Sequence, residues 1–142
     1  MDYEKTLGRQ TGVLYGLLSR RLNSLLAEAE LGITVDQFRL LTMLWKADGI
    51  TQQQLADKIG RDRASVTRMV DILENQGIIT RISDKNDRRI NLLHLTKKGR
   101  ELEETAAACA HRALEEMTKG FTEEEEAILS QLLRRAIGNL RC

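Results

Sequence analysis

Arginine and hydroxyl side chains are concentrated in one short stretch of the sequence, residues 63–68. An arginine guanidinium is a planar fork of donors that matches the two acceptor atoms of guanine, and Ser65 and Thr67 hydroxyls can reach phosphates or base edges. A second basic group, Arg88 and Arg89, follows further along the chain. An arginine at the tip of a turn can enter the narrow, electronegative minor groove of DNA. These residue types favour contacts with DNA.

The distribution of charge agrees with that interpretation. The net charge is only +1, but residues 61–100 carry ten basic and five acidic side chains, whereas residues 101–142 carry five basic and nine acidic ones. A basic block in a near-neutral chain indicates one face that meets a polyanion. Charges also cluster on ordinary solvated surfaces, so composition alone leaves both interpretations open.

The sequence carries no pattern typical of an enzyme. It has no Gly-x-Ser-x-Gly nucleophile motif and no phosphate-binding glycine loop, and the glutamates at 123–126 fit the acidic first turn of a helix. His94, Cys109 and His111 lack the spacing of metal ligands. We therefore expect no catalytic activity, no metal and no cofactor. Cys109 lies in an alanine-rich run, which favours packing over a redox role, and Cys142 is expected to be a frayed chain end.

Helical spacing of leucines predicts a long amphipathic helix at the start of the chain, ending near Leu31-Gly32. Three later helix starts are marked by capping boxes, in which a threonine and a residue three positions on satisfy each other's backbone donors. These boxes are Thr34 with Gln37, Thr51 with Gln54, and Thr122 with Glu125.

The central stretch predicts a second short helix followed by a hairpin. Asp62 can cap a helix that ends at residues 75–77. Its apolar positions Val66, Met69, Val70 and Leu73 point one way, and Ala64, Thr67, Arg68, Asp71 and Asn75 point the other. Two β-prone runs, 78–82 and 90–95, then flank a charged turn. Thr96 caps a final pair of long helices.

A helix, a capped helix, a second helix with an exposed polar face and a basic hairpin are the parts of a winged helix-turn-helix. We therefore predict a mainly α fold with a two-stranded β-hairpin wing and dimerisation helices at both ends. Within one continuous structural domain, residues 1–33 and 96–142 are expected to dimerise and residues 34–95 to bind DNA. The residues predicted to contact DNA from the second helix are Arg63, Ala64, Ser65, Thr67 and Arg68.

The sequence resembles the MarR family of multiple antibiotic resistance regulators. The similar motifs are Leu55-Ala56-Asp57, Ser65-Val66-Thr67-Arg68-Met69-Val70, Leu73-Glu74-Asn75-Gln76-Gly77-Ile78-Ile79, Asp84-Lys85-Asn86-Asp87-Arg88-Arg89 and Leu95-Thr96-Lys97-Lys98-Gly99. The resemblance covers essentially the whole chain. It implies that Arg89 enters the minor groove and that Asp87 helps to hold it, with only one of Arg88 and Arg89 inserted. Lys85 replaces a proline common early in such wings, which predicts a looser turn.

The resemblance also implies a homodimer that binds a short pseudo-palindromic operator in double-stranded DNA, usually blocking transcription. A small aromatic or lipophilic effector is expected in the crevice between the dimerisation helices and the winged helix. Tyr15 and Phe38 are candidate lining residues, although both also suit a core. A winged helix that binds proteins instead of DNA is the alternative.

Two further expectations come from apolar residues. The stripes Leu14, Leu18, Leu22 and Leu25 and Ile128, Leu132, Leu133, Ile137 and Leu140 exceed what one small winged helix can cover, so a second chain is expected to bury the remainder. No apolar run is long enough to span a bilayer, and the first residues lack the apolar stretch of a signal peptide, so we expect a cytoplasmic protein with no membrane partner.

Overall fold

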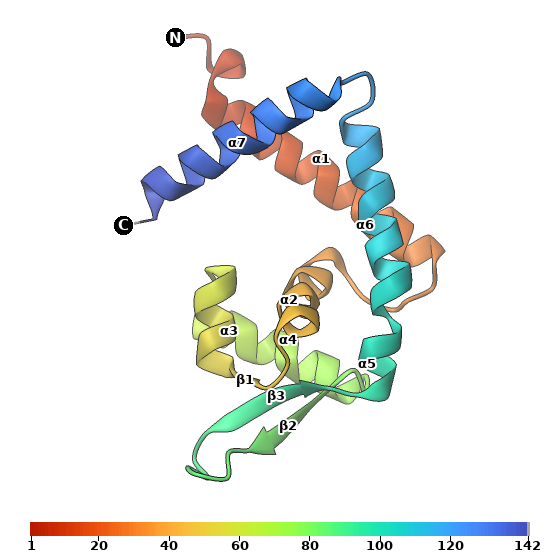
Figure 1. Cartoon of the computed structure of the whole chain (residues 1–142), viewed down its shortest axis with the longest axis vertical. Coiled ribbons are helices and arrows are strands. Elements are labelled where there is room, and N and C mark those ends of the chain that lie inside the picture. Colours follow the sequence, from red (N-terminus) through yellow and green to blue (C-terminus); the bar gives the residue numbers. More distant parts are fainter. Residues whose placement is uncertain (142) are drawn as a thin grey trace.

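Short helices with a small sheet beneath them form the lower part of Figure 1, and long helices form the upper part. The computed structural model describes residues 1–141, so Cys142 lies outside the described residues. The helices are α1 (Leu7–Glu28), α2 (Val35–Lys46), α3 (Gln52–Ile59), α4 (Arg63–Asn75), α5 (Lys97–Glu101), α6 (Glu103–Met117) and α7 (Glu123–Leu140), after a short 3-10 turn at Tyr3–Lys5. The mainly α winged-helix fold is confirmed.

The wing hairpin is formed by β2 (Ile79–Ser83) and β3 (Asn91–Leu95), which pair antiparallel. The prediction of two strands is incomplete, because a third short strand, β1 (Ile50–Thr51), pairs with the other edge of β3. Ile50 lies opposite Leu93 in this pairing. Two residues are too short a run to show an alternating pattern, so this strand could not be predicted from the sequence.

The predicted helix caps are present. In each of the three capping boxes the threonine hydroxyl accepts from the backbone N–H three residues on, and that residue's side chain accepts from the threonine N–H. Asp62 caps α4 by accepting from the Ser65 N–H. Short-range hydrogen bonds thus fix where α2, α3, α4 and α7 begin.

Two helix boundaries differ from the prediction. Helix α1 ends at Glu28, before Leu31-Gly32, because Glu30 takes a left-handed backbone conformation with φ of 56°. Thr96 caps only the short α5, which ends at Glu101, and α6 starts after Leu102. The final pair of long helices is therefore α6 and α7, with α5 as a separate turn of helix at the base of the wing.

Gly99 in α5 permits a close approach between this helix and the hairpin. A β-carbon at position 99 would collide with the carbonyl oxygen of Ile78. The carbonyl oxygen of Gly99 also accepts a hydrogen bond of 3.0 Å from Trp45 Nε1. The glycine of the Leu-Thr-x-x-Gly motif is therefore required by packing, because any side chain there would push α5 away from the wing.

One apolar core joins the winged helix to α1 and α6. Its largest fully buried side chains come from α1, α2, α3, α4 and the hairpin: Leu26, Leu40, Leu41, Leu44, Leu55, Val66, Val70, Leu73, Ile78, Ile79 and Leu93. Ala106, Cys109 and Ala113 of α6 complete this core, and α6 packs along α1. The core holds α4 and the wing in fixed positions relative to the upper helices.

Helix α7 is different, because none of its residues is buried. Its large apolar side chains Ile128, Leu132, Leu133, Ile137 and Leu140 are all exposed. Leu14 and Leu17 of α1 are exposed too, but Leu22 and Leu25 of the predicted α1 stripe are buried in the core of their own chain. None of the described helices is long and apolar enough to cross a membrane.

Candidate nucleic-acid interface

The first turn of α4 presents the predicted DNA-contacting residues at the surface. Arg63, Ala64 and Arg68 are exposed. Asp62 Oδ1 accepts from the Ser65 N–H and Asp62 Oδ2 accepts from the Ser65 hydroxyl, both at 2.8 Å. These bonds hold the pKa of the Asp62 carboxyl below its usual value. The cap is therefore ionised at neutral pH, and it orders the turn that carries the basic side chains.

Serine and threonine on α4 are already engaged within the chain. The Ser65 Oγ that donates to Asp62 also accepts from Arg68 Nη2 at 3.2 Å. Thr67 is half-buried; its hydroxyl donates to the Arg63 carbonyl at 2.9 Å and accepts from the Gln52 side-chain amide of α3. Thr67 was predicted to point outward, and it instead lies where α4 meets α3.

The wing tip carries an ion pair between Asp87 and Arg89. Arg89 Nε donates to Asp87 Oδ1 at 3.0 Å and Nη2 donates to Oδ2 at 3.1 Å. These bonds lower the pKa of Asp87. The Arg89 side chain is 90% exposed, and Arg88 is exposed as well. Asp87 thus pairs with Arg89 through two hydrogen bonds, and the Arg89 side chain stays open to solvent.

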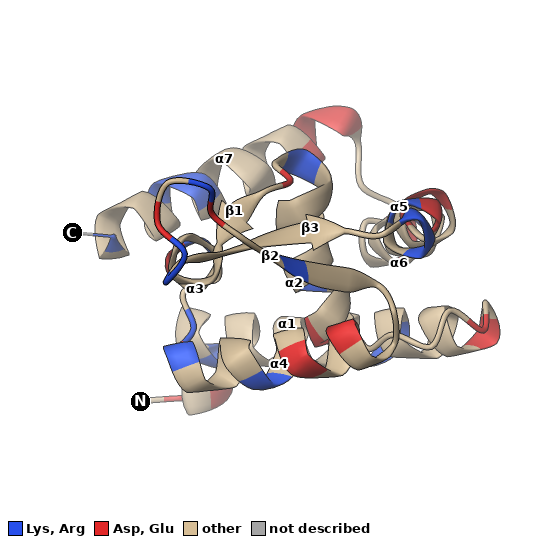
Figure 2. Ribbon diagram, turned by 90° about the horizontal axis from the view of Figure 1, so that it is seen from below, with Lys and Arg blue, Asp and Glu red and all other residues tan. Residues whose placement is uncertain are grey.

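A hollow of about 360 Å³ lies between the wing and the first turn of α4. Arg63 of α4 and Arg89 of the wing both line it. The remaining lining residues are Thr51, Gln52, Gln53, Ile90 and Asn91. Figure 2, which views this end of the molecule, shows basic residues on the wing loop and at the start of α4. Two basic groups far apart in the sequence therefore share one surface.

Not all of the basic block is free to meet a polyanion. Arg81 on β2 pairs with both Asp71 and Glu74 of α4, each at 2.7 Å. Arg61 pairs with Asp36 at 3.1 Å. Counting charges along the sequence missed these internal partners. The alternation of β2, which places Arg81 on the same face as the buried Ile79, was the signal that could have revealed the first of them.

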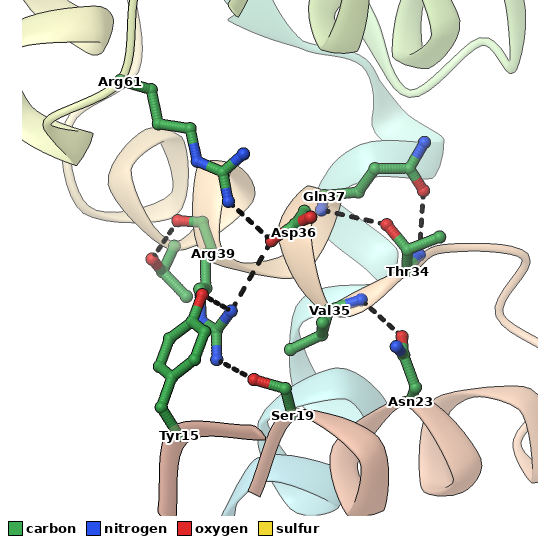
Figure 3. Close-up of polar contacts among 10 residues, drawn as sticks. Tyr15, Ser19, Asn23, Thr34, Val35, Asp36, Gln37, Arg39 and Arg61 are labelled. Atoms are coloured by element: carbon green, nitrogen blue, oxygen red, sulfur yellow. Dashed lines mark hydrogen bonds and ion pairs between the residues drawn. The ribbon is translucent and has the colours of Figure 1, made fainter. Parts of the chain in front are cut away.

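A second hollow, of about 340 Å³, lies where α1 meets the winged helix. Its lining residues are Tyr15, Asp36, Arg39, Leu40, Thr42, Met43, Lys58, Ile59, Arg61 and Met69. Figure 3 shows Arg39 between the two parts: it donates to Tyr15 Oη at 2.7 Å and to Ser19 Oγ at 2.8 Å, and it approaches Asp36 at 3.5 Å. Because Asp36 also accepts from Arg61, one polar network runs from α1 to the loop between α3 and α4, next to the Asp62 cap.

The two candidate effector residues lie apart. Tyr15 lines the hollow just described, whereas Phe38 packs edge-on against Trp45, with ring centroids 5.9 Å apart. Phe38 lines a different hollow, with Trp45, Thr42, Lys46, Glu103 and Ala107. The crevice expected to contain both side chains is therefore two separate depressions on either side of α2.

Cys109 is buried, and its Sγ lies 3.6 Å from the Leu25 carbonyl oxygen, in the contact between α6 and α1. This placement agrees with the packing role expected for it. His94 lies 3.5 Å from Asp48, with Arg100 on the same carboxylate. Residues 1–141 contain no group of three or more potential ligands that could hold a metal ion.

Helices α2 to α4 with the flanking hairpin, and basic groups on both α4 and the wing tip, define a winged helix-turn-helix protein. Comparison with known proteins gives the same class. The MarR family model matches residues 33–90. The HTH-type transcriptional regulator YdgJ of Bacillus subtilis is 37% identical over 113 residues, which cover 80% of this chain and 69% of YdgJ. The multiple antibiotic resistance protein MarR of Escherichia coli is 33% identical over 132 residues, covering 92% and 90% of the two chains.

Solved structures agree at the level of the fold. A putative MarR family transcriptional regulator from Listeria monocytogenes, crystallised with a 26mer DNA, superposes with a TM-score of 0.86 at 29% identity, covering 96% of this chain and 89% of that one. The chain belongs to the MarR family of transcriptional regulators. The expected family and class are confirmed, and since the relatives are regulators, so is the expectation that the chain is not an enzyme.

Proposed function

We propose that this regulator binds a short pseudo-palindromic operator in double-stranded DNA as a homodimer, with α4 in the major groove and the wing tip in the neighbouring minor groove. The carrying observation is the pair of arginines, Arg63 and Arg89, that α4 and the wing bring to one hollow. A helix fits the major groove, and a narrow minor groove attracts arginine. The Listeria monocytogenes relative was crystallised with a 26mer DNA, which supports DNA binding by a protein of this fold.

Within this arrangement the exposed residues take different roles. Arg68 reads a base edge, since its fork suits guanine and it lies on the exposed face of α4. Arg63, Ala64 and Ser65 lie at the start of α4, where they approach the DNA backbone. Arg89 enters the minor groove, Asp87 orients it, and Arg88 contacts phosphate. Thr67 acts indirectly, because its hydroxyl is occupied by Arg63 and Gln52.

The upper helices supply the dimer. Residues 1–33 and 96–142 dimerise and residues 34–95 bind DNA. Exposed apolar side chains on α7 and α1 support this division, because isolated soluble chains rarely leave so many on one set of helices. Two-fold symmetry would then present two α4 helices to one side of the duplex, with half-site centres about 10 base pairs apart.

Repression is relieved by a small aromatic or lipophilic effector that binds the hollow lined by Tyr15, Arg39 and Met69. This hollow touches α1, α2 and α4, so an occupant can favour one spacing of the two α4 helices over another. Phe38 faces a separate depression and is not part of this site. A regulator of this kind acts on DNA in the cytoplasm.

The deciding experiment is an unbiased selection of bound DNA from a random pool. A two-fold symmetric motif is expected, and inserting five base pairs between its halves should abolish binding because one half-site turns to the opposite face. The alternative, a winged helix that binds proteins, predicts no enriched motif and an interaction insensitive to salt, whereas phosphate contacts give a steep loss of affinity with salt. No motif, or tolerance of the insertion, would reject operator binding.

A further inference from the structure

We infer that Arg81 is a positioning residue for DNA recognition, one that fixes the wing against α4 and α3 without contacting DNA. This inference rests on the proposed function. Arg81 belongs to the basic block of residues 61–100, but its charge is paired with carboxylates of the protein itself.

The strand register places Arg81 on the inner face of the sheet. Arg81 lies directly opposite Leu93 in the antiparallel pairing of β2 and β3. Opposite residues project to the same face, and Leu93 is fully buried, so Arg81 points toward the helices. Its side chain is 20% exposed, compared with 90% for Arg89. An arginine in this position is turned away from the solvent where phosphates would lie.

Both terminal nitrogens of the Arg81 guanidinium have hydrogen-bond partners on neighbouring helices. Nη1 donates to Glu74 Oε1 and Nη2 to Asp71 Oδ1, each at 2.7 Å. The backbone N–H of Arg81 donates to Glu74 Oε2 at 3.3 Å, which ties the strand itself to α4. Nη2 also lies 3.5 Å from Gln52 Oε1 of α3, whose amide donates to Thr67. We call Arg81, Asp71, Glu74 and Gln52 the Arg81 cluster; it joins β2, α4 and α3.

The charge of the cluster argues against a direct role in binding DNA. Two carboxylates surround one guanidinium, so the cluster is net negative and repels phosphates. Carboxylates on the helix that approaches DNA weaken general attraction to DNA. Asp71 and Glu74 therefore contribute to recognition by fixing the angle between the wing and α4. Recognition requires both elements to reach their grooves together, and a misplaced wing loses its contacts even when its own side chains are intact.

Variants that disrupt the Arg81 cluster are therefore expected to change the affinity for operator DNA and the affinity for random DNA in different directions. The Asp71→Asn, Glu74→Gln double variant removes two negative charges, so random DNA should bind as well or better. Operator affinity should nevertheless fall by about 5- to 150-fold, the loss equivalent to one base contact. Arg81→Met should cause a similar operator loss with an unchanged salt slope on random DNA. In the triple variant the losses should not add, because all three residues act through one cluster.

The matched control is Asp57→Asn, which removes the charge of an exposed α3 carboxylate that accepts a hydrogen bond from Gln53 of its own helix. This change should raise affinity for operator and random DNA equally. The inference is overturned if Arg81→Met weakens both DNAs equally and lowers the salt slope by about 0.9, the signature of one lost phosphate contact. It is equally overturned if the double variant behaves like Asp57→Asn.

Amide hydrogen exchange in the free protein tests the cluster without DNA. Arg81→Met should speed exchange of the β2 amides by about tenfold or more while leaving α1 and α6 unchanged. If wild-type protein showed no operator preference, the proposed function would fail, yet this exchange would still decide whether Arg81 holds the wing. Unchanged β2 exchange would overturn the inference even in a protein that binds its operator normally.

Discussion

The guanidinium carbon of Arg39 lies 4.5 Å from the centre of the Tyr15 ring, and Arg39 Nη1 also donates to the Tyr15 hydroxyl. The contact combines a cation–π interaction with a hydrogen bond, so it fixes the direction in which α1 meets α2. Arg39 is linked through Asp36 to Arg61, which precedes Asp62, the N-cap of α4. A change at Tyr15 can therefore reach the DNA-binding helix through adjacent contacts.

The first prediction concerns an effector in the hollow beside Tyr15. A phenolic ligand bound there should weaken operator affinity, and operator DNA must weaken ligand affinity by the same factor, typically about 5- to 150-fold. Paired titrations by calorimetry measure both directions. Arg39→Met should abolish the coupling, while Phe38→Leu, in the other hollow, should preserve it. A ligand effect on DNA without the reciprocal effect would contradict this two-state mechanism.

The second prediction concerns base recognition by Arg68. Arg68→Ala should cost about 1 to 3 kcal/mol of binding free energy on the operator, because a bidentate base contact is lost. Random DNA should lose much less. Competition binding with a panel of single-base operator variants should show relaxed preference at one position per half-site. Equal losses on operator and random DNA would assign Arg68 to the phosphate backbone.

The third prediction concerns Arg89. Its exposed side chain is expected to respond to groove width and phosphate potential, so Arg89→Ala should weaken operator and random DNA by similar factors. The slope of log K against log salt should fall by about 1. Lys97→Ala provides a control, because Lys97 is equally exposed but lies on α5. An unaltered salt slope in Arg89→Ala would exclude the wing tip from the interface.

The fourth prediction concerns the dimer. Leu132→Asp introduces a charge among the exposed apolar residues of α7 and should shift the protein toward monomer at micromolar concentration. Gln131→Asp adds the same charge at the neighbouring exposed position and should leave the dimer intact. Sedimentation equilibrium distinguishes the two outcomes. A monodisperse wild-type monomer would mean that the apolar face of α7 serves another purpose.

The fifth prediction concerns the ion pair between α1 and α6. Arg21 donates three hydrogen bonds to Glu116, from Nε at 2.9 and 3.2 Å and from Nη2 at 3.0 Å, and these lower the pKa of Glu116. A carboxyl whose pKa is lower in the folded state than in the unfolded state stabilises the fold at pH values above its unfolded pKa. This contribution is lost as the pH falls through the folded pKa. Thermal unfolding should therefore show Glu116→Gln to be less stable than wild type at neutral pH, with the difference vanishing in acid. A constant difference would mean that the Glu116 charge is irrelevant.

The sequence predicted the elements that depend on near neighbours. Thr34 and Gln37 form a cap although only two residues separate them, so the start of α2 could be predicted from the local sequence. The hairpin was likewise predicted from alternating runs around a polar turn. The apolar stripe of α7 was also predicted correctly, because the spacing of apolar residues along one helix is a local property.

Long-range contacts were not readable. Arg81 was counted as one basic residue among ten, and its pairing with Asp71 and Glu74 depends on how β2 lies against α4. Tyr15 and Phe38 were predicted to share a crevice, but the rotation of α2 about its axis puts them at separate hollows. Such rotations are set by core packing across several elements, which no single stretch of sequence specifies.

Helix α7 buries none of its residues against its own chain, whereas the winged helix shares one core with α1 and α6. In the proposed dimer the apolar face of α7 is covered only when two chains meet, so the extent of its burial would rise with the number of chains in the cell. When copies are scarce, α7 would be more open to proteases, and unpaired chains would be removed faster than paired ones. The abundance of the regulator would in this way set its own lifetime, giving the cell a threshold below which the protein does not accumulate.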